Sequence, residues 1–114
     1  MKDYESLKKN KDFQLVYRKG TSYANRYLVM YVLKNELGYS RVGVSVSKKV
    51  GNSIVRHRLA RLIRESYRLN SEKVNDGYDI IFVSRVALRG KAYKDTEKSM
   101  LHLIKMHALL KEGY

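Results

Sequence analysis

The sequence contains no cysteine and no proline, and only 7 of its 114 residues are glycine. Without cysteine the chain cannot form a disulfide, a zinc–thiolate site or a thiol nucleophile, so we expect a cytoplasmic protein. The absence of proline and the few glycines argue against a long linker or a low-complexity tail. No apolar run approaches the roughly 18 residues of a membrane-spanning helix, and no signal-peptide pattern is present, so no membrane partner is expected.

Acidic residues are scarce relative to basic ones. The 24 lysines and arginines outnumber the 11 aspartates and glutamates, which leaves a formal net charge of +13. Such a charge predicts a polyanionic partner, either nucleic acid or an acidic surface. The length fits one domain over residues 1–114. Its first nine residues carry Lys2, Lys8 and Lys9 without a regular period, which predicts a partly mobile basic arm at 1–9.

Hydrophobic periodicity predicts three helices and three main strands. Asn10 is the expected cap of a short helix that carries Phe13 and Tyr17 on one face and ends at Gly20. The later elements are a strand over 26–33, a strand over 41–47, a helix from a cap at 52 or 53 to about 69, a central strand over 78–83 and a helix over 94–111. A short extra strand is expected at 45–50. The order α-β-β-(β)-α-β-α predicts an α+β fold with a single sheet of about four strands and helices packed mainly on one face.

The helix expected to begin at 52 or 53 has two unlike faces on a helical wheel. The apolar arc consists of Val55, Leu59, Leu62, Ile63 and Leu69. The basic arc, with Arg56 near its edge, consists of His57, Arg58, Arg61, Arg64 and Arg68. If the apolar arc packs on the sheet, the arginines face outward at a pitch suited to successive phosphates. Because Glu65 lies within the basic arc, a solvated face stitched by a pair between Arg61 and Glu65 is the alternative interpretation.

The run at 41–64 (RVGVSVSKKVGNSIVRHRLARLIR) closely resembles the signature of the bacterial ribonuclease P protein family. In that family a strand of small residues leads through a Lys-Lys-x-Gly-Asn turn into an arginine-rich helix that contacts a catalytic RNA. The similarity extends over nearly the whole chain, through KDFQLVYR, GTSYANR, YDIIFVSR and the last helix. His57 and Ala60 stand where the family commonly has Asn and Lys, so we expect altered local contacts with binding retained.

The resemblance implies a fold and a function. Residues 1–114 would be a single RNA-binding domain with a ribosomal-protein-like α+β fold and an unusual left-handed βαβ crossover. The domain would be the protein subunit of ribonuclease P, which removes 5′ leaders from precursor tRNA. One protein would bind one catalytic RNA, the RNA would use Mg²⁺ for the chemistry, and the protein would hold no cofactor. Arg56, Arg58 and Arg61 match the motif positions of the family. The residues expected to bind the catalytic RNA are Lys48, Lys49, Asn52, Arg56, His57, Arg58, Arg61, Arg64 and Arg68.

The resemblance also implies a cleft between the first helix and the sheet, where the single-stranded 5′ leader lies. The residues expected to bind the leader are Phe13, Tyr17, Arg18, Arg26, Tyr31 and Lys48, with Lys19 and Lys49 beside the path. Aromatic rings beside cations bind unstacked bases with little sequence preference. Ordinary core packing is the alternative for Phe13 and Tyr17, because a short helix on a sheet shows the same spacing.

No catalytic or metal-binding constellation is expected in the protein itself. His102 and His107 lie about 140° apart on the expected last helix, so they do not share a face, and each is expected to be a surface or packing histidine. The acidic residues are dispersed. Two other functions remain open from these residues alone: a structural protein that binds ribosomal RNA, and a nuclease that acts without an RNA cofactor.

Overall fold

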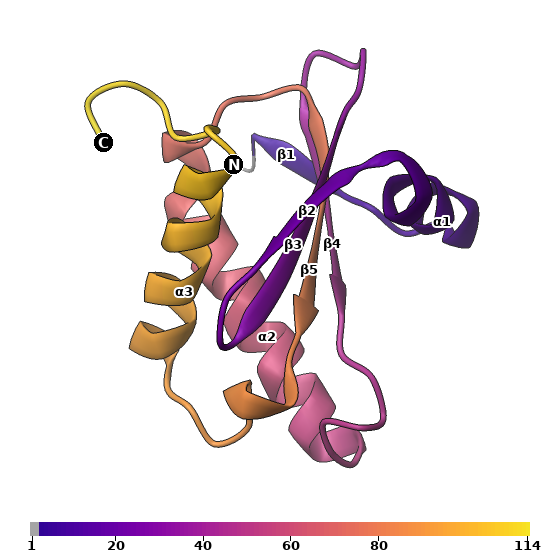
Figure 1. Ribbon diagram of the computed structural model, residues 1–114, viewed down its shortest axis with the longest axis vertical. Helices are drawn as coiled ribbons and strands as arrows, with labels where there is room; N and C mark the ends of the chain where they lie inside the picture. The colour runs from indigo at the N-terminus through magenta and orange to yellow at the C-terminus, as the bar shows by residue number, and fades with distance from the viewer. Residues whose placement is uncertain (1–2) are drawn as a thin grey trace.

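The computed structural model describes residues 3–114, which form one mixed sheet and its helices (Figure 1). In chain order the elements are β1 (Tyr4–Ser6), α1 (Asn10–Lys19), β2 (Thr21–Ala24), β3 (Leu28–Lys34), β4 (Ser40–Ser45), α2 (Ser53–Asn70), the 3₁₀ turn η1 (Ser71–Lys73), β5 (Tyr78–Ser84), the 3₁₀ turn η2 (Val86–Leu88) and α3 (Tyr93–Met106). The predicted α+β class is confirmed.

The sheet has the strand order β1-β4-β5-β3-β2, so β5 is central, as its apolar sequence predicts. Strand β4 pairs in parallel with both β1 and β5, and the helix α2 connects β4 to β5 as a parallel βαβ unit. Strand β3 pairs antiparallel with β5 and with β2. The sheet therefore has five strands in the described residues, where the sequence predicted about four.

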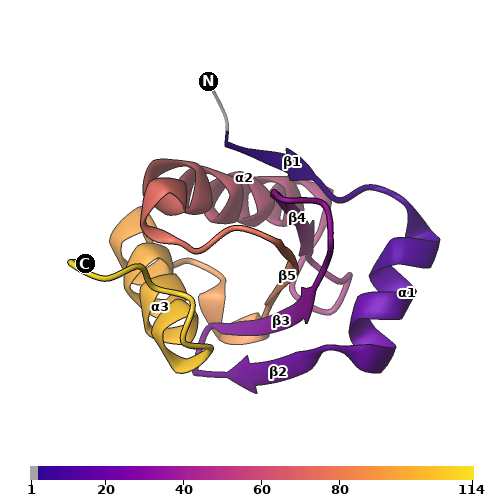
Figure 2. The same ribbon diagram turned by 90° about the horizontal axis from the view of Figure 1, so that it is seen from above.

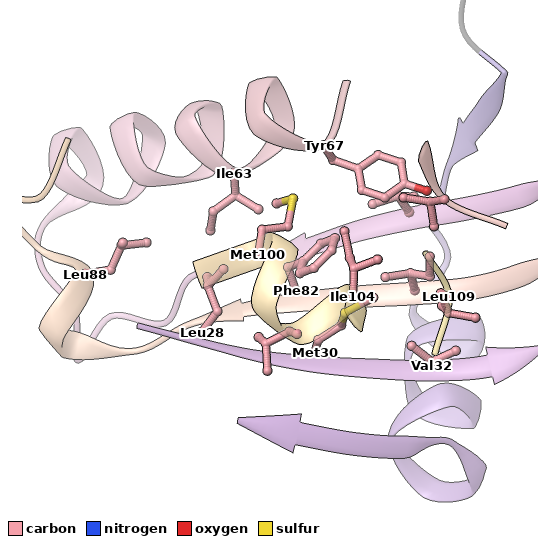
Figure 3. Close-up of a cluster of buried hydrophobic side chains, with 14 of the residues drawn as sticks. Leu28, Met30, Val32, Ile63, Tyr67, Phe82, Leu88, Met100, Ile104 and Leu109 are labelled. Carbon is pink, nitrogen blue, oxygen red and sulfur yellow. The ribbon is translucent and has the colours of Figure 1, made fainter. Parts of the chain in front are cut away.

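Helices α2 and α3 cover one face of the sheet, and α1 lies on the other (Figure 2). The main core lies between the sheet and the helix pair, with Leu59 and Ile63 of α2 fully buried. Met100, Leu103 and Ile104 supply the buried stripe of α3 (Figure 3). Removing this much apolar surface from water is the main force that holds the layers together.

The opposite face holds a smaller core under α1. Val16 is fully buried against Ile81 of β5, and the ring of Phe13 lies against the backbone of Gly43 in β4. A Cβ atom at position 43 would overlap Phe13, with Cε2 only 3.0 Å away. The small residue in β4 therefore lets α1 approach the sheet closely.

A buried ion pair stabilises the same face. Asp79 of β5 is 3% exposed, and it accepts hydrogen bonds from Arg41 Nε at 2.9 Å and Nη2 at 2.6 Å. Asn35 donates to the same carboxylate at 2.9 Å. Arg41 also reaches Asp12 of α1 at 3.4 Å, which links the helix to the sheet. The hydrogen bond from Arg41 to Asp79 raises the pKa of Arg41.

Three predicted features differ from the structure. Of the predicted arm at 1–9, Tyr4–Ser6 forms an ordered edge strand, while residues 1–2 lie outside the described residues. In the described structure no strand forms over 46–50, where Ser47 to Val50 is a turn closed by a hydrogen bond from Val50 N to Ser47 O at 3.1 Å. Helix α3 ends at Met106 rather than near 111, because Ala108 has a φ of 58°, which a continuing helix does not permit.

Candidate nucleic-acid interface

Helix α2 separates its apolar and basic side chains as the sequence predicts. Asn52 caps the helix, since its side-chain oxygen accepts a hydrogen bond from Val55 N at 3.0 Å. Leu59 and Ile63 anchor the buried side, although Leu69 is 51% exposed and does not join the core. The exposed side forms what we name the arginine face, made up of His57, Arg58, Arg61, Arg64 and Arg68.

One intrahelical ion pair interrupts the arginine face. Glu65 accepts two hydrogen bonds from Arg68, one of them from Nε at 3.1 Å. This pairing lowers the pKa of Glu65 and raises the pKa of Arg68. The alternative interpretation of this helix paired Glu65 with Arg61, but the structure shows that the partner of Glu65 is Arg68. Within residues 3–114, neither Arg61 nor Arg64 forms an ion pair.

Two arginines of the motif are held differently. Arg58 is exposed but donates a hydrogen bond from Nη2 to the Lys91 carbonyl at 2.9 Å, which fixes its guanidinium near the start of α3. Arg56 is partly buried, and its Nε is shielded from solvent without a hydrogen-bond partner in the described part of the chain. Arg56 therefore lies at the margin of the arginine face, as its place on the wheel predicts.

The end of the sheet nearest the start of α2 is hollowed. The hollow, which we name the end hollow, has a volume of 740 Å³ and contains three cationic side chains, those of Arg26, Lys49 and Arg85. Arg85 also donates a hydrogen bond to the Asn25 carbonyl at 2.9 Å. Lys48 is exposed in the adjacent turn. The structure thus brings the predicted Arg26 and Lys49 together with Arg85, which was not predicted.

Beside α1, among residues 3–114, a strip of the sheet is partly exposed to solvent. Its side chains are in register across four strands and form what we name the open row: Ala24, Val29, Val83 and Ser45. All four are at least partly exposed. Three members of the row lie close to the end hollow in the chain. Two positions after Ala24, Ser45 and Val83 come Arg26, Ser47 and Arg85, which line that hollow. The open row therefore leads directly into a basic depression.

Aromatic rings border the open row where it meets α1. The rings of Tyr17 and Tyr31 meet edge to face with their centroids 4.9 Å apart, and both are partly exposed. Burial raises the pKa of Tyr17, an effect that a hydrogen bond with Ser45 partly offsets. The centroid of the Phe13 ring lies 6.2 Å from that of Tyr17, but the contact of Phe13 with Gly43 gives its ring a packing role. Arg18 and Lys19 are exposed at the end of α1.

The titratable residues form no catalytic cluster in the part of the chain that is described. Among residues 3–114, no group of three or more His, Cys, Asp or Glu side chains gathers in a way that would hold a metal ion. His107 packs against the ring of Tyr23 and lies 2.9 Å from the Met30 carbonyl. His102 lies near Asn25, in a separate cluster. In the same residues, no helix combines the length and apolar character needed to span a membrane.

Comparison with known proteins decides between the functions left open by the sequence. The family model described as Ribonuclease P matches residues 1–108. The chain belongs to the ribonuclease P protein family. It is accordingly a subunit of the ribonuclease P holoenzyme, a ribonucleoprotein that acts in the 5′ maturation of tRNA. This membership favours the ribonuclease P subunit over a structural ribosomal protein.

Relatives of known name and structure support the assignment. The chain is 56% identical over 106 residues to the ribonuclease P protein component of Lachnoclostridium phytofermentans, covering 93% of this chain and 91% of that one. It is 55% identical over 102 residues to the component of Clostridioides difficile, covering 89% of this chain and 90% of that one. The structure of the Staphylococcus aureus RNase P protein superposes with a TM-score of 0.85 at 34% identity, covering 97% of this chain and 100% of that one. The Thermotoga maritima RNase P protein gives a TM-score of 0.82 at 32% identity, covering 90% and 96%.

The sequence did not identify one cation of the end hollow, Arg85. Arg85 follows the apolar strand YDIIFVS directly, and a basic residue at the end of a buried strand was the available signal. Its position became evident only when the strand order placed β5 between β4 and β3.

Proposed function

We propose that the arginine face binds the RNA subunit of ribonuclease P, and that the open row, its tyrosines and the end hollow bind the single-stranded 5′ leader of precursor tRNA. The RNA subunit carries out the cleavage with its own Mg²⁺ ions. The protein supplies binding energy and alignment, and one protein serves one RNA. One observation carries this proposal: the basic side chains gather on two separate surfaces. One is the arginine face of α2, and the other is the end hollow, which adjoins the open row and its tyrosines.

The arginine face suits a structured RNA backbone. Its side chains repeat every three or four residues along one side of an 18-residue helix, which presents guanidinium groups at successive turns. Arginine keeps its charge at any cellular pH and can bind phosphate through two parallel hydrogen bonds. Because Leu59 and Ile63 fix the opposite side of the helix in the core, these cations are presented without a change of fold.

The open row suits an unpaired strand. Val29 and Val83 offer a flat apolar surface, and Tyr17 and Tyr31 offer ring edges and faces beside it. A base that stacks on an aromatic side chain gains roughly 1–3 kcal/mol, and every base has a face to stack. The three cations of the end hollow then meet the phosphates of the same strand.

The test is cleavage of precursor tRNA at low Mg²⁺ by protein alone, RNA subunit alone and the two together. We expect efficient cleavage only with both. The affinity of the reconstituted enzyme is then compared for substrates with a leader of about five nucleotides and a leader of one, using the wild type and a Tyr31→Ala variant. Loss of one stacked base predicts a fall of roughly 5- to 150-fold for the long leader only.

A matched control is Tyr39→Ala, because Tyr39 is partly exposed outside the regular strands and away from the open row. Equal losses for both leaders with Tyr31→Ala would show that the ring supports the fold rather than the leader. Cleavage by the protein alone would overturn the division of labour between protein and RNA.

A further inference from the structure

We propose that α3 carries a second RNA-binding surface, distinct from the arginine face and the open row, which takes a single-stranded RNA segment. We name this surface the lysine stripe; it consists of Lys94, Lys98, His102 and Lys105, all exposed.

The stripe follows from the geometry of α3. Its core side is formed by the buried Thr96, Ser99, Met100, Leu103 and Ile104. At 100° per residue, the four members of the stripe fall within an arc of about 80° on the far side. Lys94, Lys98 and His102 are each four residues apart, a rise of about 6 Å per step, which is comparable to one nucleotide of an extended strand. The three lysines and His102 thus form a line along the helix.

The acidic residues of α3 do not neutralise this line. Asp95 accepts a hydrogen bond from Ala92 N at 3.0 Å, so its carboxylate serves the start of the helix. Glu97 accepts hydrogen bonds at 2.9 Å from both Asn70 and Tyr93, between α2 and α3, and these bonds lower its pKa. In residues 3–114 none of the three stripe lysines forms an ion pair. Their charge is available to a partner.

A hollow beside the stripe supplies an aromatic ring. It has a volume of 380 Å³, and its lining includes Arg26, which also lines the end hollow, with Tyr27, Asp95, Lys98 and His102. The Arg26 guanidinium lies 5.6 Å from the centroid of the Tyr27 ring, and the Lys91 ammonium lies 5.8 Å from it. Cations gathered around an aromatic ring are the combination that binds an unpaired nucleotide, with phosphate held by charge and base held by stacking.

Hydrogen bonds fix the hollow and orient His102. Asn25 Oδ1 accepts from Tyr27 N, Leu28 N and Ser99 Oγ, so its Nδ2 is the atom that faces His102 Nδ1, at 3.1 Å. Because the Asn25 amide nitrogen donates, His102 Nδ1 must accept, and in the neutral ring the proton lies on Nε2. The imidazole therefore offers a donor to RNA without needing a positive charge.

These features favour single-stranded RNA as the occupant. A lysine row alone would serve any polyanion, but the ring in the hollow beside it serves an unstacked base. The strand is either a segment of the ribonuclease P RNA itself or a separate RNA that the assembled enzyme captures. The proposal rests on α3 and its hollow, so it stands or fails independently of the arginine face.

The test compares two variants that lose the same charge. The stripe variant combines Lys94→Gln, Lys98→Gln and Lys105→Gln. The control variant combines Lys9→Gln, Lys11→Gln and Lys34→Gln, three exposed lysines at α1 and the end of β3. One arm measures affinity for ribonuclease P RNA across a salt series. The other measures binding of a polyuridine RNA of about 20 nucleotides to the preassembled holoenzyme.

We expect the stripe variant to lose about tenfold affinity relative to the control variant in one arm, and its slope of log affinity against log salt to fall by about 2, at about 0.7 per lost contact. A loss in the first arm identifies the enzyme's own RNA as the occupant, and a loss in the second identifies a separate strand. If the two variants bind alike in both arms, while urea unfolding shows both to be folded, the proposal is overturned.

Discussion

The ring of Phe13 occupies the space that a side chain at position 43 would fill. Gly43 therefore sets how closely α1 lies on β4, and through α1 it sets where Tyr17 stands relative to Tyr31. A residue with no side chain thus controls the border of the open row, although it offers no group to RNA.

Gly43→Ala should destabilise the fold by about 1–3 kcal/mol, because the new methyl group overlaps a half-buried ring. Urea unfolding monitored by circular dichroism measures the change. The double variant Gly43→Ala with Phe13→Leu should recover part of the loss, since the shorter side chain leaves room. An unchanged midpoint for the single variant would mean that the ring moves aside at no cost.

Glu65→Gln should raise affinity for ribonuclease P RNA by about two- to threefold, because it releases Arg68 from its pair and removes a negative charge from the arginine face. Arg61→Ala should lower affinity and reduce the salt slope by about 0.7 to 0.9. Arg89→Ala, an exposed arginine at η2, is the charge-matched control. Filter binding across a salt series tests all three, and a loss of affinity with Glu65→Gln would contradict the expectation.

Asp79→Ala should cost about 3 kcal/mol of stability, because it removes the carboxylate that accepts two hydrogen bonds from the partly buried Arg41. Glu65→Ala, which breaks the exposed pair with Arg68, should cost far less, because solvent screens a pair at the surface. Denaturant titration of the two variants side by side gives the comparison. Similar costs for the two would show that burial adds nothing to the inner pair.

His107 should make stability depend on pH. Burial lowers its pKa from the ordinary 6.5, with the Met30 carbonyl partly opposing the shift. The unfolded chain then binds a proton more readily than the folded one, so this contribution is fully present above about pH 6.5 and is lost as pH falls through the lowered value. Thermal unfolding at about pH 7.5 and about pH 5.5 should show a smaller difference for His107→Gln than for the wild type. An equal difference would assign the pH dependence to other groups.

The sequence predicted the elements whose signals are local. Helix α2 was placed within a residue at each end, because Asn52 caps it and its apolar and basic side chains alternate with helical period. The central strand β5 was evident from its run of apolar residues. The arginine face followed from the same periodicity, and the resemblance to the family extended the prediction to the whole chain.

The features that were missed depend on partners distant in sequence. Strand β1 has three residues with no alternation, and it exists because β4 pairs with it. Strand β2 is exposed throughout, so its four residues gave no buried period of their own, and only the resemblance indicated a strand within 20–26. The preference of Glu65 for Arg68 over Arg61 is a choice between two neighbours at similar helical spacing, which side-chain conformation alone decides.

The strand order has a consequence for incomplete folding. The arginine face lies within one continuous segment, Ser53–Asn70, whereas the open row joins residues 24, 29, 45 and 83 across four strands. A chain that has formed α2 but not the sheet would still carry the arginine face on one helix, with weaker presentation because Leu59 and Ile63 lack their core contacts, and would have no surface for the leader. On the proposed function, such a chain would occupy the RNA without assisting it. A variant destabilised at a residue far from either surface would therefore compete with the wild-type protein for the ribonuclease P RNA.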